Sequence, residues 1–216
     1  MYQFLKVLAL GLFFPLFRVR IIGERDFQGS AVLCSNHRSL IDPIILSCVM
    51  KRKIYYMAKS ELFDGHGNFF AWLLKSTGAF PVARSSADKG AVLEAEKLLK
   101  NGCIVGIFPQ GKIVSDETEF KIKAGASLLA MKTGAPIIPV SIYFEGKIRP
   151  FKKITVRIGE LIPVEKENGA YAKKCRVLSE RLSKTIKTLL EVKHENNFSE
   201  VGGLLLRGEQ SRYNSK

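Results

Sequence analysis

A histidine and an aspartate five positions apart, His37 and Asp42, are the residues of this chain best suited to acid–base chemistry. A neutral imidazole can take the proton of a substrate hydroxyl at one ring nitrogen while a carboxylate holds the other nitrogen. On a continuous α-helix, residues five apart differ by about 140° and face different directions. The two side chains can therefore meet only if the chain bends between them. A His-x4-Asp spacing also arises by chance, so a purely structural origin stays open on this motif alone.

The flanking residues predict such a bend. Residues 31–35 are an apolar run typical of a buried strand, and residues 43–50 are typical of a short helix. Asp42 would cap that helix, and Pro43 would occupy its first position, where the missing N–H costs nothing. His37 would then lie on the connection between strand and helix, where side chains are exposed at the mouth of an α/β sheet.

Two further segments follow predicted strands and could bind an anion. Arg84 stands just past a short strand, where a guanidinium can hold a phosphate through two hydrogen bonds, or can be an ordinary surface arginine. Gln110 and Lys112 follow another strand and offer hydrogen-bond donors, while Gly111 between them lets backbone N–H groups approach a ligand. A tight Pro-Gly turn without any ligand is the alternative there.

A third segment, residues 135–140, carries two prolines that would make it a stiff apolar strand. Proline cannot donate a ladder hydrogen bond, so the segment is predicted to be an edge strand. The wall of a pocket for an acyl chain is an equally good interpretation of the same residues.

Strand-like and helix-like segments alternate after residue 18 and predict an α/β fold. We expect a single domain over residues 19–193, with a largely parallel or mixed central sheet and helices on both faces. The predicted strands are 19–22, 31–35, 54–57, 79–82, 103–108, 136–143 and 154–158. The predicted helices are 43–50, 68–76, 88–100, 123–132 and 170–192.

The two ends of the chain differ from this domain. Residues 2–17 are almost continuously apolar but fall short of the roughly 20 residues that span a bilayer. We expect residues 1–18 to form a membrane-associating helix, and Arg18 and Arg20 favour the cytoplasmic side for the domain that follows. A core helix or a dimer contact is the alternative. The polar residues 194–216 are expected to be poorly ordered.

The net charge of the chain indicates which kinds of partner it could bind. With 34 Lys and Arg against 20 Asp and Glu, the net charge of +14 favours acidic partners such as anionic membrane, a phosphorylated substrate or an acidic carrier protein. The basic clusters 51–53 and 147–153 could hold anionic lipid or be ordinary charged surface. These clusters are not interleaved with aromatic residues, so nucleic acid is not an expected partner. Four scattered cysteines and three scattered histidines predict neither disulfides nor a bound metal.

Four sequence blocks, taken in order, resemble those of the glycerolipid acyltransferase family, in particular its bacterial 1-acyl-sn-glycerol-3-phosphate acyltransferases. The resemblance covers approximately residues 19–164. The blocks are Asn36-His37-x4-Asp42, Gly78-x-Phe80-x3-Arg84, Phe108-Pro109-Gln110-Gly111 and Pro136-Ile137-Ile138-Pro139-Val140.

The resemblance implies an enzyme that moves a fatty acyl group directly from acyl carrier protein or acyl-CoA to the sn-2 hydroxyl of lysophosphatidic acid. His37 would be the general base and Asp42 would orient it. Substrate binding is implied for Asn36, Arg84, Gln110, Gly111 and Lys112. The family needs no metal or other cofactor, and its members associate with membrane, which places this chain at the cytoplasmic face of the cell membrane.

The third block departs from the family pattern. Gln110 stands where Glu is usual, and Lys112-Ile113 replaces a common Thr-Arg. Because these positions concern acceptor binding, they leave open glycerol-3-phosphate, another lysophospholipid or a lyso-aminolipid as the acceptor. A non-catalytic peripheral membrane protein that binds anionic lipid is the alternative from a different class.

Overall fold

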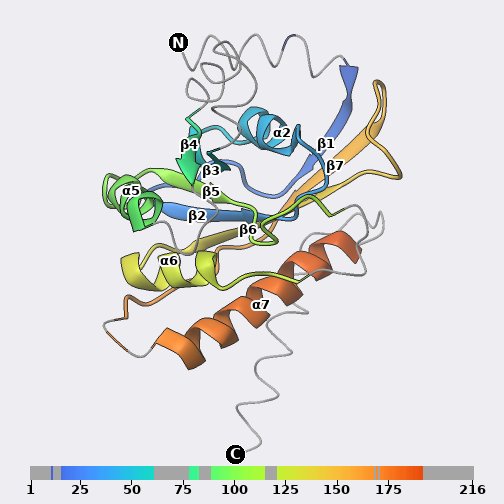
Figure 1. The fold of residues 1–216 in the computed structure, drawn as a ribbon. Helices are drawn as coiled ribbons and strands as arrows, with labels where there is room; N and C mark the ends of the chain where they lie inside the picture. The colour runs from blue at the N-terminus through green and yellow to red at the C-terminus, as the bar shows by residue number, and fades with distance from the viewer. Residues whose placement is uncertain are drawn as a thin grey trace, which may run out of the picture.

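Strands and helices alternate along the chain and form a layered α/β structure (Figure 1). The computed structural model describes residues 11, 16–60, 78–82, 89–114, 121–167, 169 and 171–191. The elements are β1 (Arg18–Ile22), β2 (Ala31–Ser35), α2 (Asp42–Val49), β3 (Ile54–Lys59), β4 (Phe80–Val82), α5 (Lys89–Lys100), β5 (Ile104–Ile107), α6 (Gly125–Thr133), β6 (Ile137–Tyr143), β7 (Lys153–Ile158) and α7 (Tyr171–Glu191).

The strands form one mixed sheet in the order β1-β7-β6-β2-β5-β3-β4. Strands β2 to β6 are parallel, whereas β7 pairs antiparallel with β6 and parallel with β1. Strand β2 lies at the centre between β5 and β6, and all five of its residues are buried. Since β2 and β5 are parallel neighbours, the residues that follow them meet at the same edge of the sheet.

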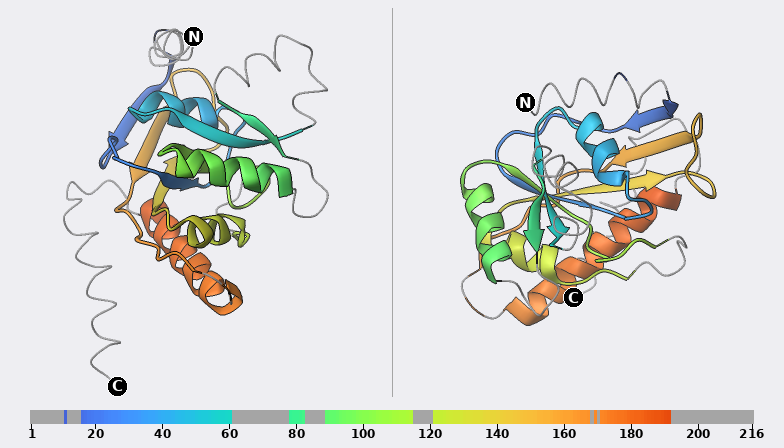
Figure 2. Two further views of the ribbon diagram at one scale, coloured as in Figure 1. Left: turned by 90° about the vertical axis from the view of Figure 1, so that its left-hand side faces the viewer. Right: turned by 45° about the horizontal axis from the view of Figure 1, so that its top comes forward.

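Helices cover both faces of the sheet, as the sequence predicts (Figures 1 and 2). Helix α2 lies on one face, while α5, α6 and α7 lie on the other. The alternation of side chains along β2 divides the core accordingly. Leu33 packs in the cluster that contains Leu46 of α2, whereas Val32 packs in the cluster that contains Leu182 of α7.

Most of the predicted elements are present, with boundaries displaced by a few residues. Helix α7 buries the predicted stripe, including Cys175, Leu182, Ile186 and Leu189. Helix α5 ends at the predicted stop, where Gly102 has a φ of 75° and its N–H bonds the Leu99 carbonyl. The predicted helix 68–76, nearly all of residues 1–15 and the tail 194–216 lie outside the described residues. Within the described parts, no helix is long and apolar enough to cross a membrane.

The prediction of an edge strand over residues 135–140 is wrong, because β6 lies inside the sheet between β2 and β7. Pro139 is tolerated there because its missing N–H lies at the end of the β6–β7 ladder and not in its middle. Its carbonyl accepts the Gly159 N–H at 2.8 Å, so its nitrogen also faces the β7 side. The regular β6–β7 pairing begins one residue later, at Val140 and Ile158, so proline removes only the reciprocal bond to Gly159, at the end of the ladder.

Candidate active site

Asn36 ends strand β2 by replacing backbone hydrogen bonds with side-chain ones. Its Nδ2 donates to the Ile142 carbonyl at 2.9 Å, and its Oδ1 accepts the Ile142 N–H at 2.7 Å. The last backbone pairing of β2 with β6 joins Ser35 to Val140, so the Asn36 amide takes the next place in the ladder. Both buried polar groups of Ile142 are thereby satisfied. The backbone after Ser35 is then free to leave the sheet and form a loop.

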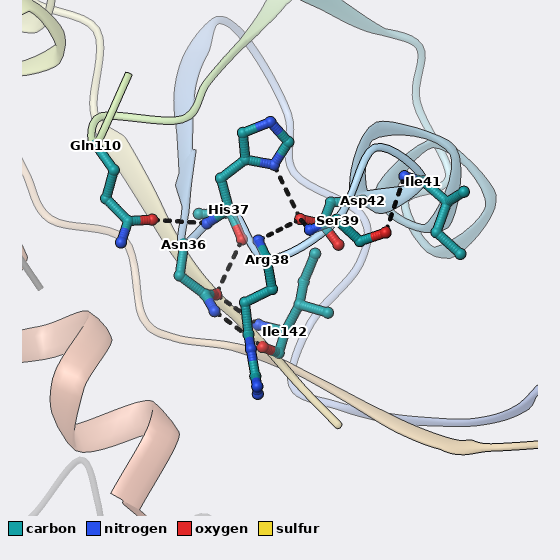
Figure 3. Close-up of polar contacts among 9 residues, drawn as sticks. Asn36, His37, Arg38, Ser39, Ile41, Asp42, Gln110 and Ile142 are labelled. Atoms are coloured by element: carbon teal, nitrogen blue, oxygen red, sulfur yellow. Dashed lines mark hydrogen bonds and ion pairs between the residues drawn. The ribbon is translucent and has the colours of Figure 1, made fainter. Parts of the chain in front are cut away.

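The structure brings His37 and Asp42 together across that loop (Figure 3). His37 Nδ1 lies 2.9 Å from Asp42 Oδ2; the imidazole is 17% exposed and the carboxylate is fully buried. The same oxygen accepts the backbone N–H groups of Arg38 at 2.7 Å and Ser39 at 2.8 Å. These donors replace the water that a buried carboxylate loses. The predicted bend therefore exists, and the carboxylate itself holds it.

Asp42 does not cap helix α2, contrary to the sequence prediction. The helix begins at Asp42, its N-cap residue is Ile41 in helical conformation, and no side chain caps it by hydrogen bonding. The reason is that Oδ2 faces back toward the loop, where the imidazole and two backbone N–H groups bind it. Oδ1 is buried and has no hydrogen-bond partner among the described residues. Pro43 does lie in the first turn, as predicted.

The contact with Asp42 fixes which nitrogen of His37 can accept a proton. An ionised carboxylate binds the ring nitrogen that carries hydrogen, so the proton belongs on Nδ1 and Nε2 keeps its lone pair. Nε2 points away from Asp42 (Figure 3). The ring stacks on Phe108, with centroids 4.1 Å apart and planes at 20°, and Phe108 stacks in turn on Tyr56. These contacts set the plane of the imidazole.

The segment after β5 holds the histidine loop from the other side. Gln110 is 7% exposed, and its Oε1 accepts the His37 N–H at 2.7 Å. Gly111 has a φ of 71°, and a Cβ added there would lie 2.9 Å from Lys123 Nζ. Lys112 and Lys123 are exposed. Gln110 thus positions the backbone of His37. Lys123 lies against the turn at Gly111, and Lys112 follows Gly111 in the chain.

The loop is also attached to two other parts of the chain. Arg38 donates from Nη1 to the Phe144 carbonyl at 2.8 Å, and its guanidinium lies 4.5 Å from the centroid of the Phe144 ring. The His37 carbonyl accepts the Val114 N–H at 2.8 Å. The first contact connects the loop to the segment that joins β6 and β7, and the second connects it to the segment after Gln110.

The candidate residues of the sequence fall into two groups. Asn36, His37, Asp42 and Gln110 are brought together, with Gly111 and Lys112 next along the chain. Arg84 lies outside the described residues, so its role in phosphate binding stays a prediction.

Sequence reasoning missed two contributions to the site. One is the stacking of Phe108 on His37, which its place directly after a strand could have suggested. The other is the pairing of Asn36 with Ile142, which no local signal announces because the two residues are 106 positions apart.

The chemistry open to this arrangement is proton transfer at His37 Nε2. Cys34 lies nearby in the sequence, but it belongs to the core cluster on the other face of the sheet, and burial strongly raises the pKa of its thiol. Cys34 therefore stays protonated and offers no nucleophile. Among the described residues, no group of three or more His, Cys, Asp or Glu side chains could hold a metal ion.

Comparisons with known proteins point in one direction. A protein-family model described as Acyltransferase matches residues 18–143. The chain is 36% identical over 115 residues to the 1-acyl-sn-glycerol-3-phosphate acyltransferase of Bacillus subtilis, covering 53% of this chain and 55% of that protein. It is 35% identical over 164 residues to the protein of the same name from Helicobacter pylori, covering 73% and 63%. Both matches cover less than two thirds of the relative's own length.

A solved structure shares the fold. The crystal structure of the 1-acyl-sn-glycerophosphate (LPA) acyltransferase PlsC from Thermotoga maritima aligns with a TM-score of 0.64 and 20% sequence identity. The alignment covers 90% of this chain and 81% of that one. At this level of identity the similarity concerns the architecture.

Proposed function

Because the chain belongs to the acyltransferase family, we propose that it moves a fatty acyl group from a thioester to the sn-2 hydroxyl of 1-acyl-sn-glycerol-3-phosphate, giving phosphatidic acid. The observation that carries this proposal is the 2.9 Å contact between His37 and Asp42, with the second ring nitrogen turned away from the carboxylate. The relatives from Bacillus subtilis and Helicobacter pylori are named for the same reaction. The donor is acyl carrier protein or acyl-CoA.

The geometry supports a direct transfer with His37 as the base. The acceptor hydroxyl loses its proton to Nε2 as its oxygen attacks the thioester carbonyl carbon. The C–S bond then breaks, and the departing thiolate takes the proton back from Nε2. Asp42 holds Nδ1–H throughout and stabilises the imidazolium that forms between the two steps. No residue is acylated, and no cofactor takes part in the proposed cycle.

We assign the acceptor's phosphate to the segment after β5 together with Arg84. Gly111 turns the chain sharply with its positive φ. The exposed Lys112 follows it in the chain, and the exposed Lys123 lies against it in space. Gln110 contributes less directly, because its oxygen is occupied by the His37 N–H. The replacement of the family's usual Glu by Gln110 therefore concerns the position of the catalytic loop as well as the binding of the acceptor.

The site of action is proposed to be the cytoplasmic face of the cell membrane. Support comes from the apolar residues 2–17 and from the net charge of +14, which suits an anionic membrane surface. Membrane lipids and the lysolipid substrate would then share one surface.

The decisive experiment incubates the purified protein with labelled acyl-CoA or acyl carrier protein and a panel of acceptors, and identifies the products by mass. The panel contains lysophosphatidic acid, glycerol-3-phosphate, a second lysophospholipid and a lyso-aminolipid. Phosphatidic acid is the expected main product. Another acylated product would correct the acceptor alone, whereas lipid binding without thioester turnover would refute the reaction.

His37→Phe tests the base while keeping an aromatic ring that can stack on Phe108. Activity is expected to fall at least about 100-fold, the lower end of what a general base contributes, with an unchanged circular dichroism spectrum. Full activity in this variant would exclude the mechanism.

Arg84→Ala is expected mainly to raise the KM for the acceptor. An unchanged KM would remove Arg84 from the phosphate site.

A further inference from the structure

The connection between β6 and β7, residues 144–152, exposes an aromatic ring on strained backbone. Phe151 is 69% exposed and has a φ of 64°. It is the one non-glycine residue with positive φ among those that the structure describes. For a bulky side chain this region of backbone space is rarely occupied and unfavourable. The backbone conformation costs the folded domain stability, and the exposed ring gains it none.

The local turn shows how unusual the residue is. The Lys152 N–H bonds the Arg149 carbonyl at 3.2 Å, which closes a four-residue turn around Pro150 and Phe151. Proline in the second position followed by a positive φ in the third is the pattern of a type II turn. The third position of that turn favours Gly or Asn, because neither is strongly disfavoured at positive φ. Phenylalanine at that position therefore needs a reason beyond the turn itself.

Lys and Arg residues flank this aromatic residue along the chain and on the neighbouring strand β1. The segment 145–153 contains four Lys and Arg residues and one Glu. The start of β1 lies beside it, because the Phe151 N–H bonds the Leu16 carbonyl at 2.5 Å and the Arg18 N–H bonds the Lys152 carbonyl at 3.1 Å. Leu16 is 42% exposed, and Arg18 is exposed. Figures 1 and 2 show this connection extending beyond the sheet beside β1. We call residues 147–153 with Leu16 and Arg18 the hairpin tip.

We propose that the hairpin tip docks on an anionic lipid bilayer, with the Phe151 ring in the interface and the basic side chains at the lipid phosphates. Apolar side chains flanked by Lys and Arg are the combination that binds the boundary between headgroups and acyl chains. Each basic residue near such a surface strengthens binding about fivefold. A bilayer also explains why the aromatic residue is presented on an exposed turn.

The hairpin tip is connected to the candidate active site. Phe144, at the base of the same connection, accepts a hydrogen bond from Arg38 and packs against its guanidinium. Arg38 in turn donates its N–H to Asp42. Docking the tip would therefore hold the histidine loop near the lipid surface. The inference itself concerns binding and does not require that acyl transfer occurs.

The test compares the full-length protein with two variants in flotation assays on phosphatidylglycerol vesicles. Phe151→Gly removes the ring and relieves the positive φ, so vesicle affinity should fall about tenfold while the melting temperature stays equal or rises. Leu93→Ala removes a side chain that is 64% exposed on α5, and its affinity should not change. Unchanged binding in Phe151→Gly, with the protein folded, would overturn the proposal.

A second pair of variants separates a local basic surface from the overall charge. Neutralising Lys147 and Arg149 to Gln should weaken binding to phosphatidylglycerol vesicles roughly 25-fold and leave binding to pure phosphatidylcholine nearly unchanged. Neutralising Lys173 and Lys187 of α7, both exposed, changes the net charge equally. Equal losses in the two double variants would overturn the proposal.

An activity measurement keeps this inference apart from the proposed function. With lysolipid dispersed in detergent, Phe151→Gly is expected to turn over substrate like the wild type. Loss of vesicle binding with this activity intact supports the docking role of the tip. If the wild type turns over no acceptor, the vesicle results still decide the docking proposal by themselves.

Discussion

Two loops that touch each other, residues 36–42 and 144–152, are built in opposite ways. In the first, the side chains of Asn36 and Asp42 and the oxygen of Gln110 bind backbone groups inside the protein. In the second, Phe151 is exposed on unfavourable backbone among exposed cations. The first loop is organised to hold one geometry. The second keeps exposed the groups that the proposed membrane contact would bury.

The difference can be tested because it predicts opposite effects of mutation. Removing a group from the first loop leaves buried partners unpaired, which costs roughly 1–3 kcal/mol for each partner. Removing Phe151 from the second loop relieves strain and uncovers nothing. Substitutions in the first loop should therefore damage activity or stability, whereas those at the hairpin tip should damage membrane binding alone.

Asp42→Asn should have the largest effect. The amide can still accept the N–H groups of Arg38 and Ser39, but it no longer holds the hydrogen of His37 Nδ1 as a carboxylate does. By analogy with the same exchange in a Ser-His-Asp triad, kcat should fall roughly 1,000- to 10,000-fold. Steady-state kinetics with circular dichroism as a fold check measures this. Asp26→Asn removes the same charge at a half-exposed position, where the carboxylate pairs with Lys51 at the surface, and should be nearly neutral.

A loss of only a few-fold in Asp42→Asn would mean that the carboxylate holds the backbone of the loop and does not orient the base. The comparison between the two loops would survive that outcome. The assignment of His37 as a base steered by Asp42 would not survive it.

Asn36→Ala should destabilise the protein by roughly 2–4 kcal/mol, because it leaves the N–H and the carbonyl of Ile142 buried without partners. Urea denaturation measures the free energy of unfolding. Asn101→Ala, at an exposed position after α5, is the control and should change stability by less than about 0.5 kcal/mol. A similar, small effect in both variants would show that the Asn36 amide adds little to the β2–β6 pairing.

Gln110→Leu tests whether this residue acts through the histidine loop. It leaves the His37 N–H without its acceptor, so kcat should fall about tenfold, in keeping with roughly 1–2 kcal/mol for one lost hydrogen bond, while KM for the acceptor changes little. Gln110→Glu keeps an acceptor oxygen and should retain most of the activity. If Gln110→Leu raised KM with kcat unchanged, Gln110 would belong to the acceptor site instead.

The sequence predicts the local features of this protein better than the long-range ones. Strand β2, the bend after it and the meeting of His37 with Asp42 follow from residues within a dozen positions. The position of β6 inside the sheet does not, because two prolines normally indicate an edge. Only the pairing partners show that the missing N–H of Pro139 lies at the end of the β6–β7 ladder, where it costs a single bond. The cap assigned to Asp42 failed for a local reason, since the donors that bind its carboxylate precede it by only three to five residues.

The conformation of Phe151 is likewise invisible in the sequence. Arg149-Pro150-Phe151-Lys152 contains proline but no glycine or asparagine, so nothing announces a positive φ in the third position. Residues 147–153 stand out in the sequence only as a basic cluster. Exposure, backbone strain and proximity to β1 turn that cluster into a specific surface.

Phe151→Asn should have the smallest effect and the opposite sign to Asn36→Ala. Asparagine tolerates positive φ better than phenylalanine does, so the free energy of unfolding should rise by about 0.5–1 kcal/mol. Urea denaturation in the absence of lipid measures it, and vesicle flotation of the same sample should show weaker binding. A variant that is more stable but binds membrane less would show that the sequence of residues 144–152 serves binding, whereas that of residues 36–42 serves the folded geometry. A destabilised Phe151→Asn would instead mean that the ring packs within the chain and that the hairpin tip resembles the histidine loop.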